Sequence, residues 1–227
     1  MLAALQGPRV KMSKGQEIVY EGQSQHAAYL LHEGWVCSYK LLQDGRRQTI
    51  DIQIPGDFLG LRSVLLRTSD HSFVTLTDVE VSRIRTQTIW ETFRSAPNLA
   101  LALLWAASRD EAIVVEHLVS IGRRDPFSRT AHFLLELGAR MKLVGYGTAS
   151  GYECPLSQSV LADALGITAI HLNRVLRQLR EANLLVFRKG RVTFLDKGKL
   201  VELTGFDPDY LDWDKPVFTS GSAWKSG

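Results

Sequence analysis

Cysteine is scarce in this 227-residue sequence, which contains only Cys37 and Cys154. Two thiols are too few for a disulfide framework or for a four-cysteine iron–sulfur site within one chain. Long apolar runs are also missing, because none reaches the roughly 18 residues that a membrane-spanning helix needs. The apolar start of the chain is too short for a signal peptide. We therefore expect a cytoplasmic protein without a membrane partner.

Common enzyme motifs are absent as well. No His-x-His pair occurs, although a metal-dependent β-barrel enzyme would commonly carry one on a strand. The sequence contains neither a nucleophile elbow nor a phosphate-cradling glycine loop. We therefore expect no catalytic residues and no metal site, and a metal-dependent β-barrel enzyme remains only a remote alternative.

Two short helical patterns that meet at one glycine are the most informative feature that is present. Ser157 and Thr168 stand where the two helices would begin, and both can cap a helix N-terminus. Gly166 lies between them and can supply a turn with positive φ. The second helix has a regular apolar face formed by Leu172, Val175, Leu176 and Leu179. This pattern predicts a helix-turn-helix that binds double-stranded DNA, with an ordinary helical hairpin as the alternative.

A basic segment follows the predicted helix-turn-helix. Residues 185–195 predict two short strands joined by a tight turn at Lys189-Gly190. From Ser157 to Leu200, eight basic and three acidic residues give a net charge of +5, against a formal +3 for the whole chain. A local positive field suits phosphate contacts, so we predict a winged helix-turn-helix. For any single charge, a solvated helix face is the alternative.

The first part of the chain, residues 10–84, predicts β-structure. Glycines at 15, 22, 34, 45 and 56 separate short β-rich runs at intervals of roughly 7 to 12 residues, a rhythm typical of a sandwich or barrel. Asp44-Gly45 is a hairpin turn signal, and Pro55-Gly56-Asp57 marks another turn.

One long helix is predicted over residues 98–122, where glycine occurs only at the last position and proline is absent. At about 1.5 Å per residue it would be roughly 37 Å long, too long for a small domain to bury alone. Two adjoining stripes with 3–4 spacing favour a parallel coiled coil with a second copy, and a single helix lying on its own β-structure is the alternative. The predicted dimer interface consists of Leu99, Leu103, Ala106, Asp110, Ile113, Val114, His117 and Ile121.

The order of these features resembles the cyclic-AMP receptor / fumarate-nitrate-reduction (Crp/Fnr) family of bacterial transcription regulators. The resemblance covers residues 10 to about 203 and rests on KGQEIVYEGQ, the glycine-spaced β-runs, IPGDFLG and the terminal winged helix-turn-helix. It implies an α+β fold: an N-terminal antiparallel β-roll, jelly-roll-like and similar to cyclic-nucleotide-binding domains, then a dimerisation helix and a DNA-binding domain. The implied bounds are residues 1–97, 98–124 and 125–204, followed by an acidic-aromatic tail, residues 205–227.

The resemblance also implies what the protein does. A homodimeric regulator of this family would bind an inverted-repeat DNA site and act with RNA polymerase. Its base-reading residues would match Ile170, Asn173 and Arg174, and Arg174 suits bidentate contact with a guanine. Asn173 could bind adenine or a phosphate, and Ile170 could contact a thymine methyl group, although the family commonly has Glu there. The predicted DNA-binding residues are Thr168, Ala169, Ile170, His171, Asn173, Arg174, Arg177, Arg188, Lys189 and Arg191.

The effector pocket implied by the family departs from the cyclic-nucleotide pattern. In the matching segment, residues 60–72, Leu61 stands at the position of a ribose-binding Glu, and His71 replaces a phosphate-binding Arg. The lost Arg removes a bidentate phosphate partner, so cyclic-AMP dependence is disfavoured and the effector is unknown. Gating by a cyclic nucleotide or another small ligand in an altered pocket is the alternative. The candidate pocket residues are Gly60, Leu61, His71, Ser72, Val114 and Val115.

No cofactor is predicted, although haem remains conceivable. His26, His32, His71 and His117 are its candidate ligands, and a lone histidine is more often a structural residue.

The tail alternates aspartates with Tyr210, Trp213 and Phe218. It is either disordered or packs back on the β-roll or a neighbouring subunit.

Overall fold

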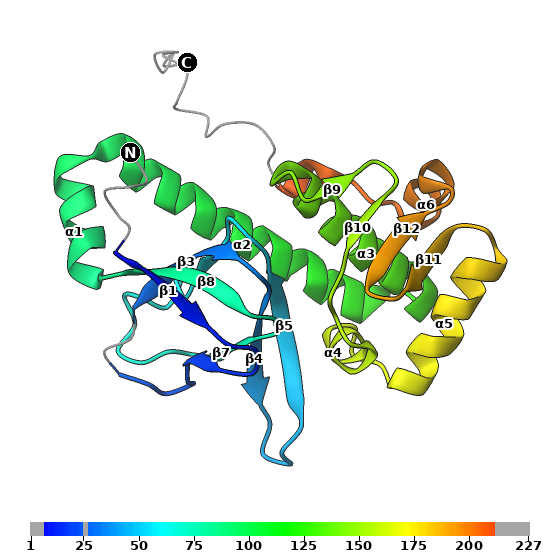
Figure 1. The fold of residues 1–227 in the computed structure, drawn as a ribbon, viewed down its shortest axis with the longest axis horizontal. Helices are drawn as coiled ribbons and strands as arrows, with labels where there is room; N and C mark the ends of the chain where they lie inside the picture. Colours follow the sequence, from blue (N-terminus) through cyan, green and yellow to red (C-terminus); the bar gives the residue numbers. More distant parts are fainter. Residues whose placement is uncertain (1–6, 25–26, 212–227) are drawn as a thin grey trace.

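The computed structural model describes residues 7–24 and 27–211. Figure 1 shows the β-strands of the N-terminal half at one end of the molecule and the helix-rich C-terminal half at the other. Helix α2 (Pro97–Arg123) runs along both halves. This arrangement confirms the predicted α+β fold with antiparallel sheets before a long helix and a C-terminal helix-turn-helix.

The N-terminal half is a roll of two four-stranded antiparallel sheets, with strand orders β1-β8-β3-β6 and β2-β7-β4-β5. Side chains of Leu31, Val36 and Phe73 fill the space between the sheets. Gly34 (φ +84°) makes the turn between β3 and β4, where a Cβ atom would lie 2.2 Å from the carbonyl oxygen of Asp78. The strands are β1 (Arg9–Met12), β2 (Glu17–Val19), β3 (Ala28–Glu33), β4 (Val36–Leu41), β5 (Arg47–Gln53), β6 (Phe58–Leu59), β7 (Ser72–Thr75) and β8 (Val79–Ile84).

The C-terminal half is built around helix α3, which is buried along most of its length. Asp125 caps α3 by accepting hydrogen bonds from the backbone N–H groups of Phe127 and Ser128, and Pro126 occupies its first turn. The elements are α3 (Pro126–Leu143), β9 (Gly147–Thr148), β10 (Gly151–Glu153), α4 (Gln158–Ala164), α5 (Ala169–Glu181), β11 (Leu185–Arg188), β12 (Arg191–Phe194), α6 (Lys197–Thr204) and the 3₁₀ helix η2 (Pro208–Leu211).

The two halves share one apolar core. Ile52 of β5 and Ile54, just after that strand, belong to the same buried cluster as Leu134 and Leu137 of α3. Helix α1 (Thr86–Ser95) and the first half of α2 instead cover the outer side of the β-roll. The C-terminal half is therefore seated directly on the sheet that contains β4 and β5.

The beginning of the tail packs on the helices. Phe206 and Leu211 are buried, and η2 lies against α2 and α3. We expected this segment to be disordered or to pack on the β-roll or a neighbouring subunit. For residues 205–211 that expectation is corrected, since their apolar side chains complete the core of their own C-terminal half. Trp213 and Phe218 lie outside the described residues.

Candidate nucleic-acid interface

Helices α4 and α5 form the predicted helix-turn-helix, with the caps and the turn at the expected residues. The Ser157 hydroxyl accepts a hydrogen bond from Val160 N at 3.2 Å, and that of Thr168 accepts one from His171 N at 3.2 Å. Gly166 has a φ of +63°, the left-handed conformation that favours glycine. Arg129 of α3 donates to the carbonyl oxygen of Leu165 at 2.7 Å, which ties the turn to α3.

Helix α5 has one buried and one exposed face. Leu172, Val175, Leu176 and Leu179 are buried against the core, as their spacing predicts. The opposite face exposes Asn173, Arg174 and Arg177, and Ile170 is 78% exposed. An isoleucine this exposed, beside polar and cationic side chains, is available for contact with another molecule. Thr168, Ala169 and His171 at the start of the helix are exposed as well.

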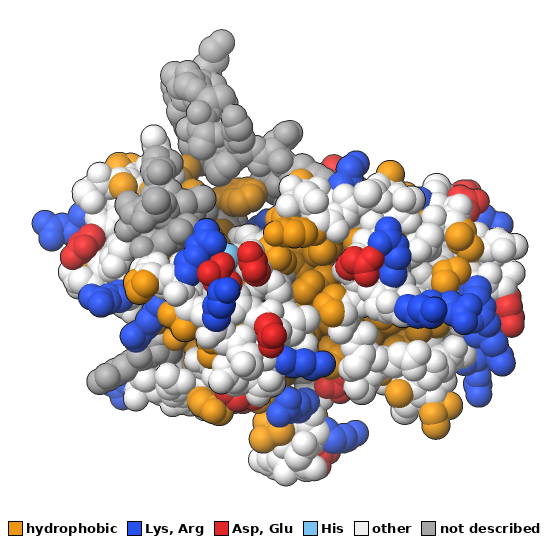
Figure 2. Space-filling view, viewed as in Figure 1, with side chains coloured by type: hydrophobic (Ala, Val, Ile, Leu, Met, Phe, Trp, Pro, Cys, Tyr) orange, Lys and Arg blue, Asp and Glu red, His pale blue; other side chains and the backbone are white. Residues whose placement is uncertain are grey.

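The wing places three more basic residues at the same end of the molecule. Strands β11 and β12 pair Arg188 with Arg191, and the turn residues Lys189 and Gly190 both have positive φ. All three basic side chains are exposed, although Arg191 forms an ion pair with Glu153. Figure 2 shows Lys and Arg side chains gathered at the end where α5 lies. The structure thus brings the predicted DNA-binding residues to one end of the molecule.

The β-roll contains a small cavity of about 20 Å³ at the predicted effector pocket. Gly60, Leu61, His71 and Val114 line it, as predicted. Ser72 does not, because its hydroxyl accepts a hydrogen bond from Glu21 N, and Val115 lies on the exposed face of α2. Sequence analysis missed several polar lining residues that come from β4, β5 and α2: Ser38, Asp51, Gln53 and Asp110.

The cavity has polar side chains in its lining and has room for about one water molecule. Burial, together with the charge of Asp57, raises the pKa of Asp110 to about 7. His71 carries little positive charge near neutral pH, since burial lowers its pKa despite the neighbouring Asp70. Its Nδ1 lies 2.7 Å from Asp70 Oδ1. So small a space has no room for a cyclic nucleotide, and its lining combines the carboxyl groups of Asp51 and Asp110 with the cationic side chain of Arg62.

The candidate haem ligands occupy separate structural positions. His32 Nε2 of β3 lies 2.8 Å from the hydroxyl of Ser82 on β8, whereas His117 of α2 contacts Glu136 of α3. His71 lies at the cavity. His26 lies outside the described residues. The imidazole rings of His32, His71 and His117 therefore hydrogen-bond to different parts of the chain.

Helix α2 turns a different face outward from the one predicted. Leu99, Leu103 and Ala106 are buried against residues of the β-roll and α1, and Ile113 is buried in the core shared with the C-terminal half. Asp110 faces the cavity. His117 also points into the chain, toward Glu136. These six residues therefore cannot form the predicted dimer interface, because their side chains are already packed within one chain.

The free apolar surface of α2 is its outer face, defined here as Leu104, Val115, Leu118, Val119 and Ile121. All five side chains are exposed, and Leu118 is 70% exposed. Of the predicted interface residues, Ile121 belongs to this face and Val114 borders it, half-buried. The face continues at Leu104 into an apolar groove where Trp90 and Phe93 of α1 are also exposed. An exposed apolar surface of this extent is typical of a protein interface.

Comparison with known proteins agrees with this geometry. A cyclic nucleotide-binding domain model matches residues 9–96, and a Crp-like helix-turn-helix domain model matches residues 128–203. The chain is 32% identical over 193 residues to the nitrogen fixation regulation protein FixK of Rhizobium meliloti, covering 83% of this chain and 84% of that protein. The chain belongs to the Crp/Fnr family of transcription regulators.

A second relative and a solved structure are also similar to this chain. The transcriptional activatory protein AadR of Rhodopseudomonas palustris is 27% identical over 189 residues, which are 82% of this chain and 77% of that protein. The solved structure of FixK2 from Bradyrhizobium japonicum superposes with a TM-score of 0.78 at 26% identity, covering 86% of this chain and 96% of that chain.

Crp/Fnr regulators bind DNA, and the family acts as dimers. The protein is therefore a DNA-binding transcription regulator, and the alternative of a β-barrel enzyme is set aside because its relatives are regulators. Within residues 7–24 and 27–211, no helix is both long and apolar enough to cross a bilayer.

Proposed function

We propose that two copies of this regulator pair along the outer face of α2 and bind an inverted-repeat DNA site. Leu104, Leu118 and Ile121 recur at helical spacing on a 27-residue helix, and their side chains are exposed in the single chain. Pairing two such helices removes this apolar surface from water. The dimer would then present two copies of α5 to half-sites about one helical turn apart.

The residues that we propose to read DNA bases lie on the exposed face of α5. Arg174 is assigned bidentate contact with a guanine, Asn173 contact with adenine or a phosphate, and Ile170 contact with a thymine methyl group. The remaining exposed residues are assigned to backbone contacts, which set register without reading sequence. They are Thr168, Ala169, His171 and Arg177 of the helix-turn-helix and Arg188, Lys189 and Arg191 of the wing.

Arg174→Ala tests the assignment of base reading. The substitution should weaken binding to the preferred inverted repeat by about 1 to 3 kcal/mol and relax preference at one symmetric base pair. Binding to random duplex should fall much less, since only one phosphate-attracting charge is lost. Fluorescence anisotropy at fixed salt measures both affinities.

Arg180→Ala is the matched control, because Arg180 is exposed on the same helix and carries the same charge. It should weaken both duplexes to a similar, small extent. Equal losses on specific and random DNA for Arg174→Ala would show that Arg174 does not read a base.

We further propose that the regulator needs no cyclic nucleotide. The support is the small size of the cavity, in which Leu61 and His71 stand at the positions of the family's ligand-binding Glu and Arg. Cyclic AMP or cyclic GMP at millimolar concentration should change operator affinity less than twofold. A tenfold change with either nucleotide would favour the alternative, a regulator gated through a pocket that opens.

Two further parts of the proposal follow from membership of the family. We also propose that the regulator contacts RNA polymerase. Since bacterial DNA lies in the cytoplasm, we place the protein there.

A further inference from the structure

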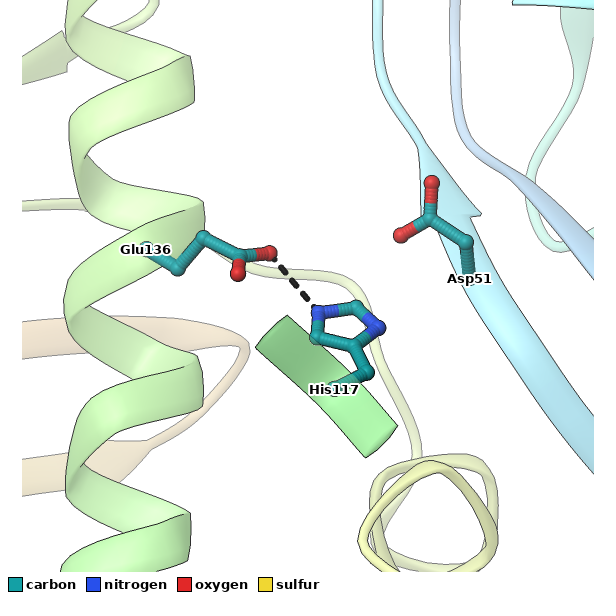
Figure 3. A group of neighbouring side chains, drawn as sticks. All are labelled: Asp51, His117 and Glu136. Carbon is teal, nitrogen blue, oxygen red and sulfur yellow. Dashed lines mark hydrogen bonds and ion pairs between the residues drawn. The ribbon is translucent and has the colours of Figure 1, made fainter. Parts of the chain in front are cut away.

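Buried and partly buried ionisable groups from four parts of the chain meet where the β-roll contacts the C-terminal half. We call them the junction cluster. It consists of Asp51 and Asp57 from the β-roll, His117 of α2, Glu136 and Arg140 of α3, and Tyr210 of η2. Figure 3 shows that Asp51, His117 and Glu136 approach one another from three different elements.

Arg140 anchors α3 to the β-roll. Its Nη2 lies 2.7 Å from Asp57 Oδ2 and 2.9 Å from the carbonyl oxygen of Ile52, and its Nη1 lies 3.2 Å from Asp51 Oδ1. Both carboxylates and the guanidinium are buried. A buried guanidinium left without these partners is costly, so the bonds oppose any movement of α3 away from the sheet.

Glu136 forms the second half of the cluster. This fully buried carboxylate accepts hydrogen bonds from His117 Nε2 at 2.9 Å and from the Tyr210 hydroxyl at 2.7 Å. Burial alone would lower the pKa of His117, but the charge and hydrogen bond of Glu136, together with the charge of Asp51 and the carbonyl oxygen of Ile50, outweigh it and raise that pKa to about 9. The pair is thus ionised at neutral pH, and it links α3 to α2 and to the C-terminal segment.

A metal ion is the competing interpretation, because one donor atom each from Asp51, His117 and Glu136 lie within 4.8 Å of one another. Arg140 Nη1 already stands 3.5 Å from Glu136 Oε1 and 3.2 Å from Asp51 Oδ1. The protonated His117 donates to Glu136 in addition. These two cations neutralise the carboxylates and take the hydrogen-bonding positions that metal coordination would need. The observations therefore favour an ion-pair cluster.

The cluster is connected to both functional regions. Asp51 also lines the small cavity of the β-roll. At the other end of α3, Arg129 bonds the carbonyl oxygen of Leu165 in the helix-turn-helix. Because α3 is a continuous helix, a change in its seating on Asp51 and Asp57 would move the turn and α5 with it.

We propose that the junction cluster is an internal lock that fixes the orientation of the helix-turn-helix on the β-roll without a bound effector. This proposal deepens the proposed independence from cyclic nucleotides and rests on it. The shared apolar core also joins the two halves, and the lock adds a directional, hydrogen-bonded constraint to that contact.

Distances between two spin labels test the lock in the full-length protein. Labels on cysteines introduced at Lys14 and Glu202 report on the two halves, since both positions are exposed. The native thiols react poorly, because burial raises the pKa of Cys37 to about 11 and that of Cys154 to about 12. Labelled chains are mixed with excess unlabelled chains, so that each measured pair lies within one subunit.

The parent protein should give one narrow distance distribution, unchanged by cyclic AMP. Arg140→Met should at least double its width. Tyr210→Phe, which keeps the ring but removes the hydroxyl bonded to Glu136, should broaden it to a smaller extent. Arg9→Met is the matched control, because it removes an exposed ion pair, between Arg9 and Glu80, that joins two strands of the β-roll and does not reach the C-terminal half. That variant should leave the distribution unchanged.

An unchanged distribution in a folded Arg140→Met protein would overturn the lock. If that variant does not fold, Tyr210→Phe decides, and an unchanged width in it would overturn the lock equally. A parent distribution that is broad, or that narrows only with cyclic AMP, would also overturn it. No DNA is present in this measurement, so failure to find an operator would count against the proposed DNA site and leave the lock intact.

Discussion

Leu118→Arg is expected to turn the dimer into a folded monomer. Leu118 is 70% exposed in the single chain, so arginine fits there without disturbing the core. In the proposed dimer, the two Leu118 side chains lie in the apolar contact between the paired α2 helices. Two guanidinium groups there would lose hydration and repel each other. Affinity for the inverted repeat should fall at least about 100-fold, because the half-sites would no longer be bound by linked subunits.

Sedimentation gives the mass of the variant, thermal unfolding its stability, and anisotropy its affinity for DNA. Leu41→Arg is the matched control, since Leu41 is 59% exposed on the β4–β5 hairpin, away from α2. It should remain dimeric and bind the repeat normally. A Leu118→Arg protein that stays dimeric would show that the outer face of α2 is not the subunit interface.

The free energy of unfolding should fall as the pH rises from about 6.5 to above 9. The pKa of His117 is about 9 in the folded chain, where Glu136 and Asp51 overcome the effect of burial, against an ordinary histidine pKa of 6.5. Folding therefore favours the protonated ring. This stabilisation is complete below pH 6.5 and is lost as the pH passes through 9. The difference corresponds to about 3 kcal/mol.

Urea unfolding at a series of pH values measures this loss. His117→Gln retains a hydrogen-bond donor but cannot titrate, so its stability should vary much less between pH 6.5 and 9.5. The groups around the ring are Glu136, Asp51, Arg140 and Tyr210. The pKa of Glu136 is held at about 2, the pKa values of Arg140 and Tyr210 are raised above their already high ordinary values, and burial raises the pKa of Asp51. Parallel pH profiles for the two proteins would contradict the ion pair.

The helix-turn-helix was predictable because its signals are local. Ser157, Gly166 and Thr168 act on backbone groups within a few residues, and the apolar spacing of α5 has one interpretation. The same holds for the wing, where Lys189-Gly190 sets the turn. Such features depend little on the rest of the fold.

The face of α2 was harder to predict, because the helix has apolar residues on two sides. Leu103 and Leu104 are adjacent in sequence, yet the first is buried on the chain's own β-roll and the second is exposed. Spacing gave a helix with an apolar stripe but could not decide which stripe faces the β-roll. That choice depends on tertiary packing.

The junction cluster had no sequence signal. Asp51, Arg140 and Tyr210 lie far apart along the chain, and each is of a type that is most often a surface residue or a partial core residue. Only the fold brings them together. The same is true of Asp110, which was assigned to a subunit contact and in the structure lines the cavity.

The mass of the complex with DNA tests the central claim most directly. Sedimentation of the wild-type protein with an inverted repeat, at physiological salt and with no added nucleotide, should show two chains per duplex. Its affinity should exceed that for a scrambled duplex of equal length by at least about 1,000-fold. One chain per duplex, with equal affinity for both sequences, would contradict the account.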